Sequence, residues 1–466
     1  MAADVLSRWY RLKGDDVFFL TGLDENSIKT VQAAKELGRD IQEYADLMAE
    51  KWKKVWKILN ISNNDLIRTT EARHKENVTN FFMLVYGKGD IYKGKYEGLY
   101  CEGCEAFLTK SDLVNGKCPL HKKIPKVIKE ENYFFKLSKY QDRILKHIEE
   151  NPSFIQPKSR RSEIISFINA GLNDVSISRP NIDWGIKLPT DEKHRFWVWF
   201  DALINYLFDE KYWPATLHLI AKDILRFHTV IWPGMLLSAG YTLPKMIYAH
   251  GFLTVDGQKM SKSLGNVIDP QYLVEKYSVD ALRFFLIRNT PFGQDGDFSE
   301  KALKARLNNE LAANIGNFIN RTLTFIWTRF EGKIPKPKKY VKQDKEFEEK
   351  IKLISSEVTE ELESMRLDKS LEKILEFSSY CNRYFQQKEP WAKKNNAHTC
   401  LFLCANAARN LAILLAPYLP VSSENLWKQL NLKNSVHMQD WSSASKLAIR
   451  SEHKINKPKI LFKIVK

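Results

Sequence analysis

Residues 257–266 read Gly-Gln-Lys-Met-Ser-Lys-Ser-Leu-Gly-Asn, and this stretch decides which fold the rest of the chain has to build. Lys259 and Lys262 lie among serines, between Gly257 and Gly265. Lysine offers a compact, flexible charge to phosphate, and serine hydroxyls with glycine-freed backbone N–H groups add neutral donors. The stretch therefore predicts a cationic loop that can close over a polyphosphate. The alternative is a solvated basic turn, which is the commoner fate of lysines beside glycine.

The composition is that of a globular protein with an anionic partner. The 466 residues allow about three domains, and 44% hydrophobic residues suffice for a sizeable core. The formal net charge of +16 indicates a polyanion, most commonly nucleic acid, without separating RNA from DNA or a membrane surface. The sequence has no apolar run of about 18 residues and no signal-peptide pattern. We therefore expect a soluble, cytoplasmic protein without a membrane partner.

A recurring order of strand, polar terminus and helix predicts a parallel sheet of the dinucleotide-binding type. Residues 5–12 have helical spacing and precede a predicted buried strand at 17–20, and residues 31–59 read as amphipathic helix. Further strands are predicted at 175–180, 196–203 and 217–220, and helices near 138–150 and 160–170. Ligands gather at the carboxyl ends of such strands, so Asp24 and Glu25 are candidate binding carboxylates. A helix-capping or turn aspartate is the equally plausible alternative.

Two short cysteine and histidine motifs predict a metal site. Cys101-x-x-Cys104 is followed by Cys118-x-x-His121, and each motif places two soft or borderline ligands on a tight turn. Four such ligands suit tetrahedral Zn²⁺ in a closed, structural site. The alternative is that the cysteines are merely buried and His121 is a surface residue.

The last third of the sequence predicts a helical bundle. One apolar stripe continues over several helical turns. Its residues are Leu303, Leu307, Leu311, Ile315, Phe318, Ile319, Leu323 and Ile326. Asn317 and Arg321 lie four residues apart and off this stripe, where a solvated edge is the default interpretation.

Taken in order, these motifs resemble the methionyl branch of the class I aminoacyl-tRNA synthetases, in its bacterial type with one pair of zinc knuckles. The resemblance is carried by Thr-Gly-Leu-Asp-Glu at 21–25, Ser-Ile-Ser-Arg at 176–179, Val-Trp-Phe-Asp-Ala-Leu at 198–203, Ala-Lys-Asp-Ile at 221–224 and Lys-Met-Ser-Lys-Ser at 259–263. It covers essentially the whole chain. It implies a class I Rossmann-type catalytic domain with a zinc-binding insertion, followed by an all-α anticodon-binding bundle.

The resemblance also implies a function in protein biosynthesis: a ligase that activates methionine with ATP and Mg²⁺ and transfers it to methionine tRNA. Asp24 would hold the methionine amino group with support from Arg179, Trp199 and His228 would line the thioether pocket, and Asp223 would help to position the substrate. The implied catalytic residues are Lys259, Ser261 and Lys262, and the implied ATP-binding residues are His250, Gly251, Lys259, Met260 and Lys262. The implied anticodon residues are Asn317, Arg321 and Trp391, whose indole would stack on an unpaired base.

The same resemblance predicts boundaries and departures. We expect catalytic segments at 1–90 and 173–298, the zinc insertion at 91–172 and the anticodon domain at 299–466, in a chain that acts as a monomer. The His-x-Gly-His element of the class does not occur, so we expect an upstream strand to be missing and adenylation to be greatly reduced. Asn26-Ser27 also stand where the family usually has His-Gly. The alternative function is a non-catalytic, synthetase-derived tRNA-binding protein.

Overall fold

The computed structural model describes residues 1–466 except 104–105, 109–112, 181, 261–266, 393–396 and 466. The chain divides into two compact units. The first, here called the α/β unit, comprises Leu20–Lys54 and Asn63–His250. The second, here called the helical unit, comprises Met1–Phe19, Val55–Ser62 and Gly251–Lys466.

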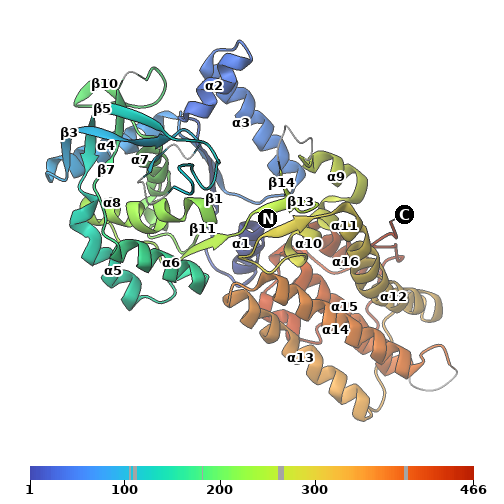
Figure 1. The fold of residues 1–466 in the computed structure, drawn as a ribbon. Coiled ribbons are helices and arrows are strands. Elements are labelled where there is room, and N and C mark those ends of the chain that lie inside the picture. The colour runs from blue at the N-terminus through green and yellow to red at the C-terminus, as the bar shows by residue number, and fades with distance from the viewer. Residues whose placement is uncertain (104–105, 109–112, 181, 261–266, 393–396, 466) are drawn as a thin grey trace. The chain divides into compact units, whose positions relative to one another are not determined.

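Parallel strands form the centre of the α/β unit (Figure 1). β1 (Leu20–Leu23) pairs with β2 (Asp65–Arg68), and β12 (Ile247–His250) lies between β11 (His218–Ala221) and β6 (Ile155–Gln156). The register of β11 and β12 sets Ala221 opposite His250, so these two strands end at the same edge. This arrangement confirms the predicted parallel-sheet class.

Two antiparallel sheets complete the unit. β3 (Ile91–Cys101) and β5 (Lys126–Phe135) pair along most of their length and are flanked by β4 (Ala106–Leu108) and β7 (Val175–Ser176). β10 (Asp191–Phe196) lies between β8 (Ser178–Pro180) and β9 (Lys187–Leu188). The helices are α2 (Ile28–Glu36), α3 (Ile41–Ile58), α4 (Ala72–Gly87), α5 (Gln141–Glu150), α6 (Lys158–Asn169), α7 (Val198–Leu203) and α8 (Trp232–Ala239).

Two strand predictions are wrong in this unit. The strand predicted at 17–20 begins only at Leu20, because its hydrogen-bonding partner β2 is in register with Leu20–Leu23. The aromatic run at 196–203, predicted as a strand, contributes one residue to β10 and then forms the helix α7. A short, continuously apolar run suits a buried strand and a buried helix equally well, so periodicity alone could not separate them. The predicted helix at 31–59 is divided into α2 and α3.

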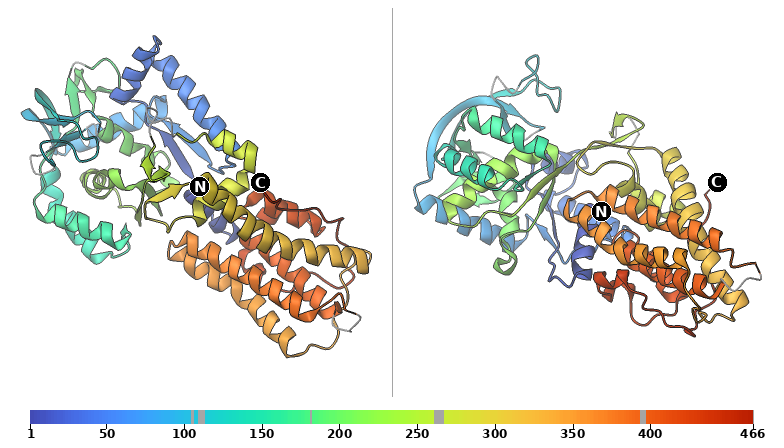
Figure 2. Two further views of the ribbon diagram at one scale, coloured as in Figure 1. Left: turned by 45° about the vertical axis from the view of Figure 1, so that its right-hand side comes forward. Right: turned by 90° about the horizontal axis from the view of Figure 1, so that it is seen from below.

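The helical unit contains α1 (Ala2–Leu12), a small sheet of β13 (Leu253–Val255), β14 (Gln258–Lys259) and β15 (Gly296–Phe298), and a helical bundle. The other helices of this unit are α9 (Pro270–Tyr277), α10 (Val279–Arg288), α11 (Glu300–Arg306), α12 (Asn317–Arg329), α13 (Lys342–Glu363), α14 (Leu367–Lys388), α15 (Ala397–Leu415) and α16 (Pro420–Gln429). Of these, α12, α13, α14 and α15 run alongside one another in both views of Figure 2, where they are coloured from gold to red. A π-helical segment, Leu307–Gly316, joins α11 to α12.

The predicted apolar stripe forms part of the bundle core. All eight of its residues, from Leu303 to Ile326, are buried. Among the described residues, α15 alone is long and apolar enough to cross a membrane, but 89% of its apolar window is buried inside the fold. We therefore assign α15 to the core of the bundle.

A buried ion pair ties α1 to α10 and to the bundle. Nη2 of Arg283 lies 2.6 Å from Oδ2 of Asp4, and both side chains are fully buried. Arg283 also donates from Nε to the carbonyl oxygen of Tyr418 over 2.9 Å. Burial by itself would raise the pKa of Asp4, but Arg283 and Arg8 outweigh burial and lower it to about 2. Asp4 is therefore ionised at neutral pH and holds the guanidinium in place.

Candidate functional site

An aromatic cluster, formed by Trp199, Tyr206, Phe227 and His228, lies where α7 meets the π-helical segment Phe227–Ile231. Trp199 stacks on Phe227 with ring centroids 3.9 Å apart and an angle of 4° between the planes. The His228 ring meets Trp199 edge-on, with centroids 6.2 Å apart. The structure thus brings together Trp199 and His228, the two residues for which the sequence predicts a thioether pocket.

Hydrogen bonds fix the protonation of the cluster. Nδ1 of His228 lies 3.0 Å from the carbonyl oxygen of Ile224, which can only accept, so Nδ1 carries the proton. Nε2 then accepts from the hydroxyl of Tyr206 over 2.9 Å. Burial lowers the pKa of His228 to about 4, so the imidazole is neutral at physiological pH. Nε1 of Trp199 is buried and has no hydrogen-bond partner among the described residues.

Tyr206 is the member of the cluster that the sequence analysis missed. Once residues 198–203 are recognised as a helix, Trp199, Leu203 and Tyr206 recur at the spacing of one helical face. That spacing was the signal available in the sequence. The strand predicted for residues 196–203 obscured this spacing, because in a strand side chains alternate between the two faces and do not recur every three to four residues.

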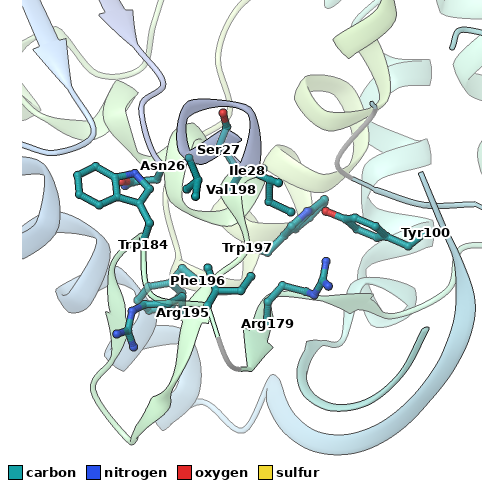
Figure 3. Close-up of a pocket in the computed structure, with 12 residues that line it drawn as sticks. Asn26, Ser27, Ile28, Tyr100, Arg179, Trp184, Arg195, Phe196, Trp197 and Val198 are labelled. Atoms are coloured by element: carbon teal, nitrogen blue, oxygen red, sulfur yellow. The ribbon is translucent and has the colours of Figure 1, made fainter. Parts of the chain in front are cut away.

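A small cavity of about 30 Å³ lies next to the start of α7 (Figure 3). Trp184, Trp197, Tyr100 and Arg179 are among the residues that line it. The Arg179 guanidinium lies over the Tyr100 ring at 4.4 Å and forms a two-pronged ion pair with Glu130, at 3.0 and 3.2 Å. Its Nη1 atom is buried without a hydrogen-bond partner among the described residues. The sequence predicted that Arg179 supports Asp24 and gave no sign that Glu130 pairs with it.

Asn26 lines the same cavity and is held by the buried pair of Asp201 and His74. Nδ2 of Asn26 donates to Oδ2 of Asp201 over 2.6 Å and to the carbonyl oxygen of Thr69 over 3.3 Å. The other oxygen of Asp201 lies 2.5 Å from Nε2 of His74, and both of these side chains are buried. The side-chain amide of Asn26, which stands where the resemblance implies a histidine, is therefore fixed in orientation.

The remaining predicted carboxylates lie at strand ends. Asp24 directly follows β1 and Asp223 follows β11, and both side chains are exposed. The adjacent Glu25 is buried and accepts from Nε of Arg68 at 2.9 Å, so Glu25 has a structural partner of its own. Each predicted aspartate thus follows the carboxyl end of a parallel strand, where such sheets bind ligands, Asp24 after β1 and Asp223 after β11.

Three of the four predicted metal ligands converge. Nδ1 of His121 lies 3.8 Å from Sγ of Cys101 and 3.7 Å from Sγ of Cys118. A tetrahedral Zn²⁺ with ordinary Zn–S and Zn–N bonds requires sulfur-to-nitrogen separations of roughly 3.6 Å. A Cβ atom added to Gly103 would lie 2.4 Å from the His121 ring, so glycine is needed there. Cys104 lies outside the described residues, and the three described ligands fit a metal.

The lysine-rich loop begins at a tight hairpin in the helical unit. β13 and β14 are joined by Asp256 and Gly257, both with positive φ, as a two-residue turn requires. Oδ1 of Asp297 accepts from the Gly257 backbone N–H over 2.8 Å. Gly251 has no room for a side chain, because an added Cβ would lie 2.3 Å from the backbone of Gln294. Ser261 and Lys262 lie outside the described residues, whereas His250, Lys259 and Met260 stand at or beside strand ends.

The three predicted anticodon residues occur together on the helical unit. Arg321 lies over the rings of Phe385 at 4.6 Å and Trp391 at 5.6 Å, and its Nη2 donates to Oε1 of Gln386 over 3.0 Å. Asn317 stands one turn earlier on α12 and is exposed, and the indole of Trp391 is 39% exposed. An exposed aromatic face beside a guanidinium is suited to stacking with an unpaired base.

Comparison with known proteins agrees with this arrangement. Residues 1–123 and 109–323 match the family described as tRNA synthetases class I (M), and residues 344–466 match the anticodon-binding domain of tRNA ligase. Methionine--tRNA ligase from Caldanaerobacter subterraneus subsp. tengcongensis is 43% identical over 99% of this chain and 75% of that protein. The Thermotoga maritima enzyme of the same name is 42% identical over 95% of this chain and 74% of that protein.

The fold agrees with a solved structure over the same extent. The crystal structure of Mycobacterium tuberculosis methionyl-tRNA synthetase bound by methionyl-adenylate superimposes with a TM-score of 0.95 at 35% identity. The match covers 99% of this chain and 95% of that one. The chain therefore belongs to the methionyl-tRNA synthetases, the methionine--tRNA ligases of class I.

Proposed function

We propose that the chain's methionine--tRNA ligase activity uses the aromatic cluster to bind the methionine side chain. The observation that carries this assignment is the neutral Tyr206–His228 pair among stacked rings. A thioether is apolar, polarizable and a weak hydrogen-bond acceptor, so it favours aromatic faces and uncharged donors. The buried N–H group of Trp199 is a donor that the sulfur would satisfy.

The polar end of methionine is assigned to the strand ends and the cavity. Asp24 offers a carboxylate to the ammonium group of methionine, and Arg179 offers its unused Nη1 to the methionine carboxylate. Asp223 helps to position the substrate. Glu130 keeps the Arg179 guanidinium in one orientation, so less side-chain entropy is lost when the substrate binds.

Activation and transfer follow as two steps. A carboxylate oxygen of methionine attacks the α-phosphorus of ATP bound with Mg²⁺, and the bond to pyrophosphate breaks. A hydroxyl of the terminal ribose of methionine tRNA then attacks the acyl carbonyl, and AMP leaves. Lys259 and Lys262 neutralise the charge of the departing pyrophosphate. The full set of ATP-binding and catalytic residues is His250, Gly251, Lys259, Met260, Ser261 and Lys262.

Three further assignments complete the proposal. Zn²⁺ bound by Cys101, Cys104, Cys118 and His121 would stabilise the 91–172 insertion without contributing to the chemistry. Asn317, Arg321 and Trp391 read the anticodon in the 299–466 domain. The enzyme acts as a monomer in the cytoplasm, with catalytic segments at 1–90 and 173–298.

Two matched tryptophan variants test the division of roles. Trp199→Ala removes one wall of the aromatic cluster and should raise the KM for methionine while leaving the KM for tRNA unchanged. Trp391→Ala should raise the KM for tRNA, because stacking on a base is worth about 1 to 3 kcal/mol, and leave methionine-dependent pyrophosphate exchange unchanged. Each variant is the control for the other. Equal effects of both variants on both parameters would overturn the assignment.

A further inference from the structure

A ladder of side-chain hydrogen bonds joins the anticodon helix α12 and its π-helical entry to α14. Asn314 contacts Ser379, Asn317 contacts Asn382, and Arg321 contacts Gln386. Each pair is separated by 65 residues. The two helices therefore run parallel and side by side, as Figure 1 shows for α12 and α14.

The amides in this ladder have a fixed direction. Nδ2 of Asn314 lies 3.0 Å from the carbonyl oxygen of Leu375, so this atom must be the nitrogen and must donate. Nδ2 of Asn382 faces the backbone oxygen of Asn314 at 3.0 Å, the Oδ1 of Asn314 at 3.3 Å and the carbonyl oxygen of Ser378 at 3.2 Å. Three acceptors surround that atom, so a flipped Asn382 amide would place oxygen against oxygen.

The fixed orientation of Asn382 also sets the orientation of the exposed Asn317 amide. With its nitrogen committed, Asn382 turns Oδ1 to Asn317, which donates from Nδ2 over 2.9 Å. Oδ1 of Asn317 then points away from Asn382 and has no hydrogen-bond partner among the residues that the structure describes. The side chain is exposed on the same face as Arg321 and Trp391. The ladder therefore presents a carbonyl acceptor to a base stacked there.

We propose that Asn314 and Asn382 are positioning residues that lock the Asn317 amide with its oxygen outward, and so select cytosine over uracil at the first anticodon position. This inference rests on the proposed anticodon-binding function. The methionine codon AUG pairs with the anticodon CAU, whose first base carries an exocyclic amine at C4, where uracil carries a carbonyl. A fixed acceptor meets a donor in cytosine and another acceptor in uracil, and the mismatch leaves two oxygens facing one another. An amide free to flip would satisfy either base.

The test uses the full chain and two anticodon stem-loop RNAs that differ only in a CAU or UAU anticodon. Fluorescence anisotropy at one fixed salt concentration gives the ratio of their dissociation constants. We expect Asn382→Leu, which removes the acceptor for Asn317, to lower the CAU preference by about fivefold or more.

The controls separate positioning from general damage. Gln387→Leu makes the same kind of change at an exposed position of α14 that forms no side-chain hydrogen bond within the described part of the chain, and it should leave the ratio unchanged. Methionine-dependent pyrophosphate exchange should be unaffected in every variant. If Asn382→Leu does not fold, Asn382→Val removes the same acceptor and carries the same expectation.

Two outcomes distinguish failure of the inference from failure of the function beneath it. A wild-type chain that prefers CAU, with a preference that Asn382→Leu leaves intact, overturns the positioning role alone. A wild-type chain that binds both RNAs equally, or neither, overturns the anticodon assignment and the inference with it.

Discussion

The hydroxyl of Tyr206 donates to Nε2 of His228 over 2.9 Å, while the opposite nitrogen of the same ring donates to a backbone carbonyl. Both nitrogens of the imidazole are therefore used, and the ring is held neutral in one orientation. A charged ring in this position would attract carboxylates and repel a thioether's apolar surface. The Tyr206–His228 contact thus explains how an otherwise apolar cluster can contain a histidine and still suit a methionine side chain.

Replacing Tyr206 by phenylalanine tests this contact. The change keeps the ring but leaves Nε2 of His228 buried without a donor, a loss of about 1 to 3 kcal/mol. We expect Tyr206→Phe to raise the KM for methionine by roughly tenfold in pyrophosphate exchange, with the KM for ATP unchanged. Tyr212→Phe makes the same chemical change at a tyrosine outside the cluster and should have no effect. Equal KM values for methionine in the two variants would refute the assigned role.

Acid should destabilise the fold through the buried histidines. Burial lowers the pKa of His228 to about 4 and of His218 to about 3, from an ordinary value of 6.5. Between those values the unfolded chain binds protons that the folded chain does not, so stability falls as the pH is lowered below 6.5 and is independent of these groups above it. Each histidine contributes about 1.4 kcal/mol per pH unit at most.

Urea unfolding of wild type and His218→Phe at pH 7, 6 and 5 measures this effect. As the pH is lowered, the free energy of unfolding of the variant should fall less steeply than that of wild type, because a phenylalanine ring cannot titrate. The difference in slope corresponds to the binding of about one proton. The neighbouring Tyr206 ring keeps an aromatic partner in the variant. Parallel pH dependence in the two proteins would show that His218 is not buried neutral.

The buried Asp4–Arg283 pair should be costly to break. Arg283→Met leaves the Asp4 carboxylate buried without its main counter-ion, which typically costs about 3 to 5 kcal/mol. Arg283→Lys keeps the charge and loses only part of the hydrogen-bonding fork, so it should cost less. Chemical denaturation gives both values. A loss of unfolding free energy below about 1 kcal/mol in Arg283→Met would contradict the structural role assigned to this pair.

Metal removal should affect the insertion and not the chemistry. Cys101→Ser removes one converging ligand, so we expect loss of bound zinc and faster proteolysis between β3 and β5. Cys381→Ser, at a buried free thiol of α14, should keep one zinc per chain. Zinc content by atomic emission, read alongside limited proteolysis, checks both expectations. Full zinc content in the Cys101→Ser protein would contradict the proposed zinc site.

Local patterns predicted most of the fold. The helical stripe from Leu303 to Ile326 and the helix at 5–12 were predictable because a repeat of 3.6 residues is visible in a linear sequence. The strand ends that carry Asp24 and Asp223 followed from apolar runs that stop at polar residues. The helix α7 did not, because its aromatic run lacks the alternation that separates a helix from a buried strand.

Partners across the fold were beyond the sequence. Glu130 pairs with Arg179 across 49 residues, and Asn382 orients Asn317 across 65. No local pattern marks such pairs, because their contact depends on how β5 approaches β8 and on the register of α12 against α14. The motif residues could be found one by one, whereas the residues that orient them needed the structure.

Methionine-dependent exchange of labelled pyrophosphate into ATP is the most direct assay of the proposed methionine pocket. We expect exchange that is slow, because the His-x-Gly-His element does not occur, but that saturates with methionine and is not supported by equal concentrations of leucine or isoleucine, whose side chains lack a polarizable sulfur. Exchange that is absent with methionine, or that proceeds equally with all three amino acids, would contradict the proposed pocket.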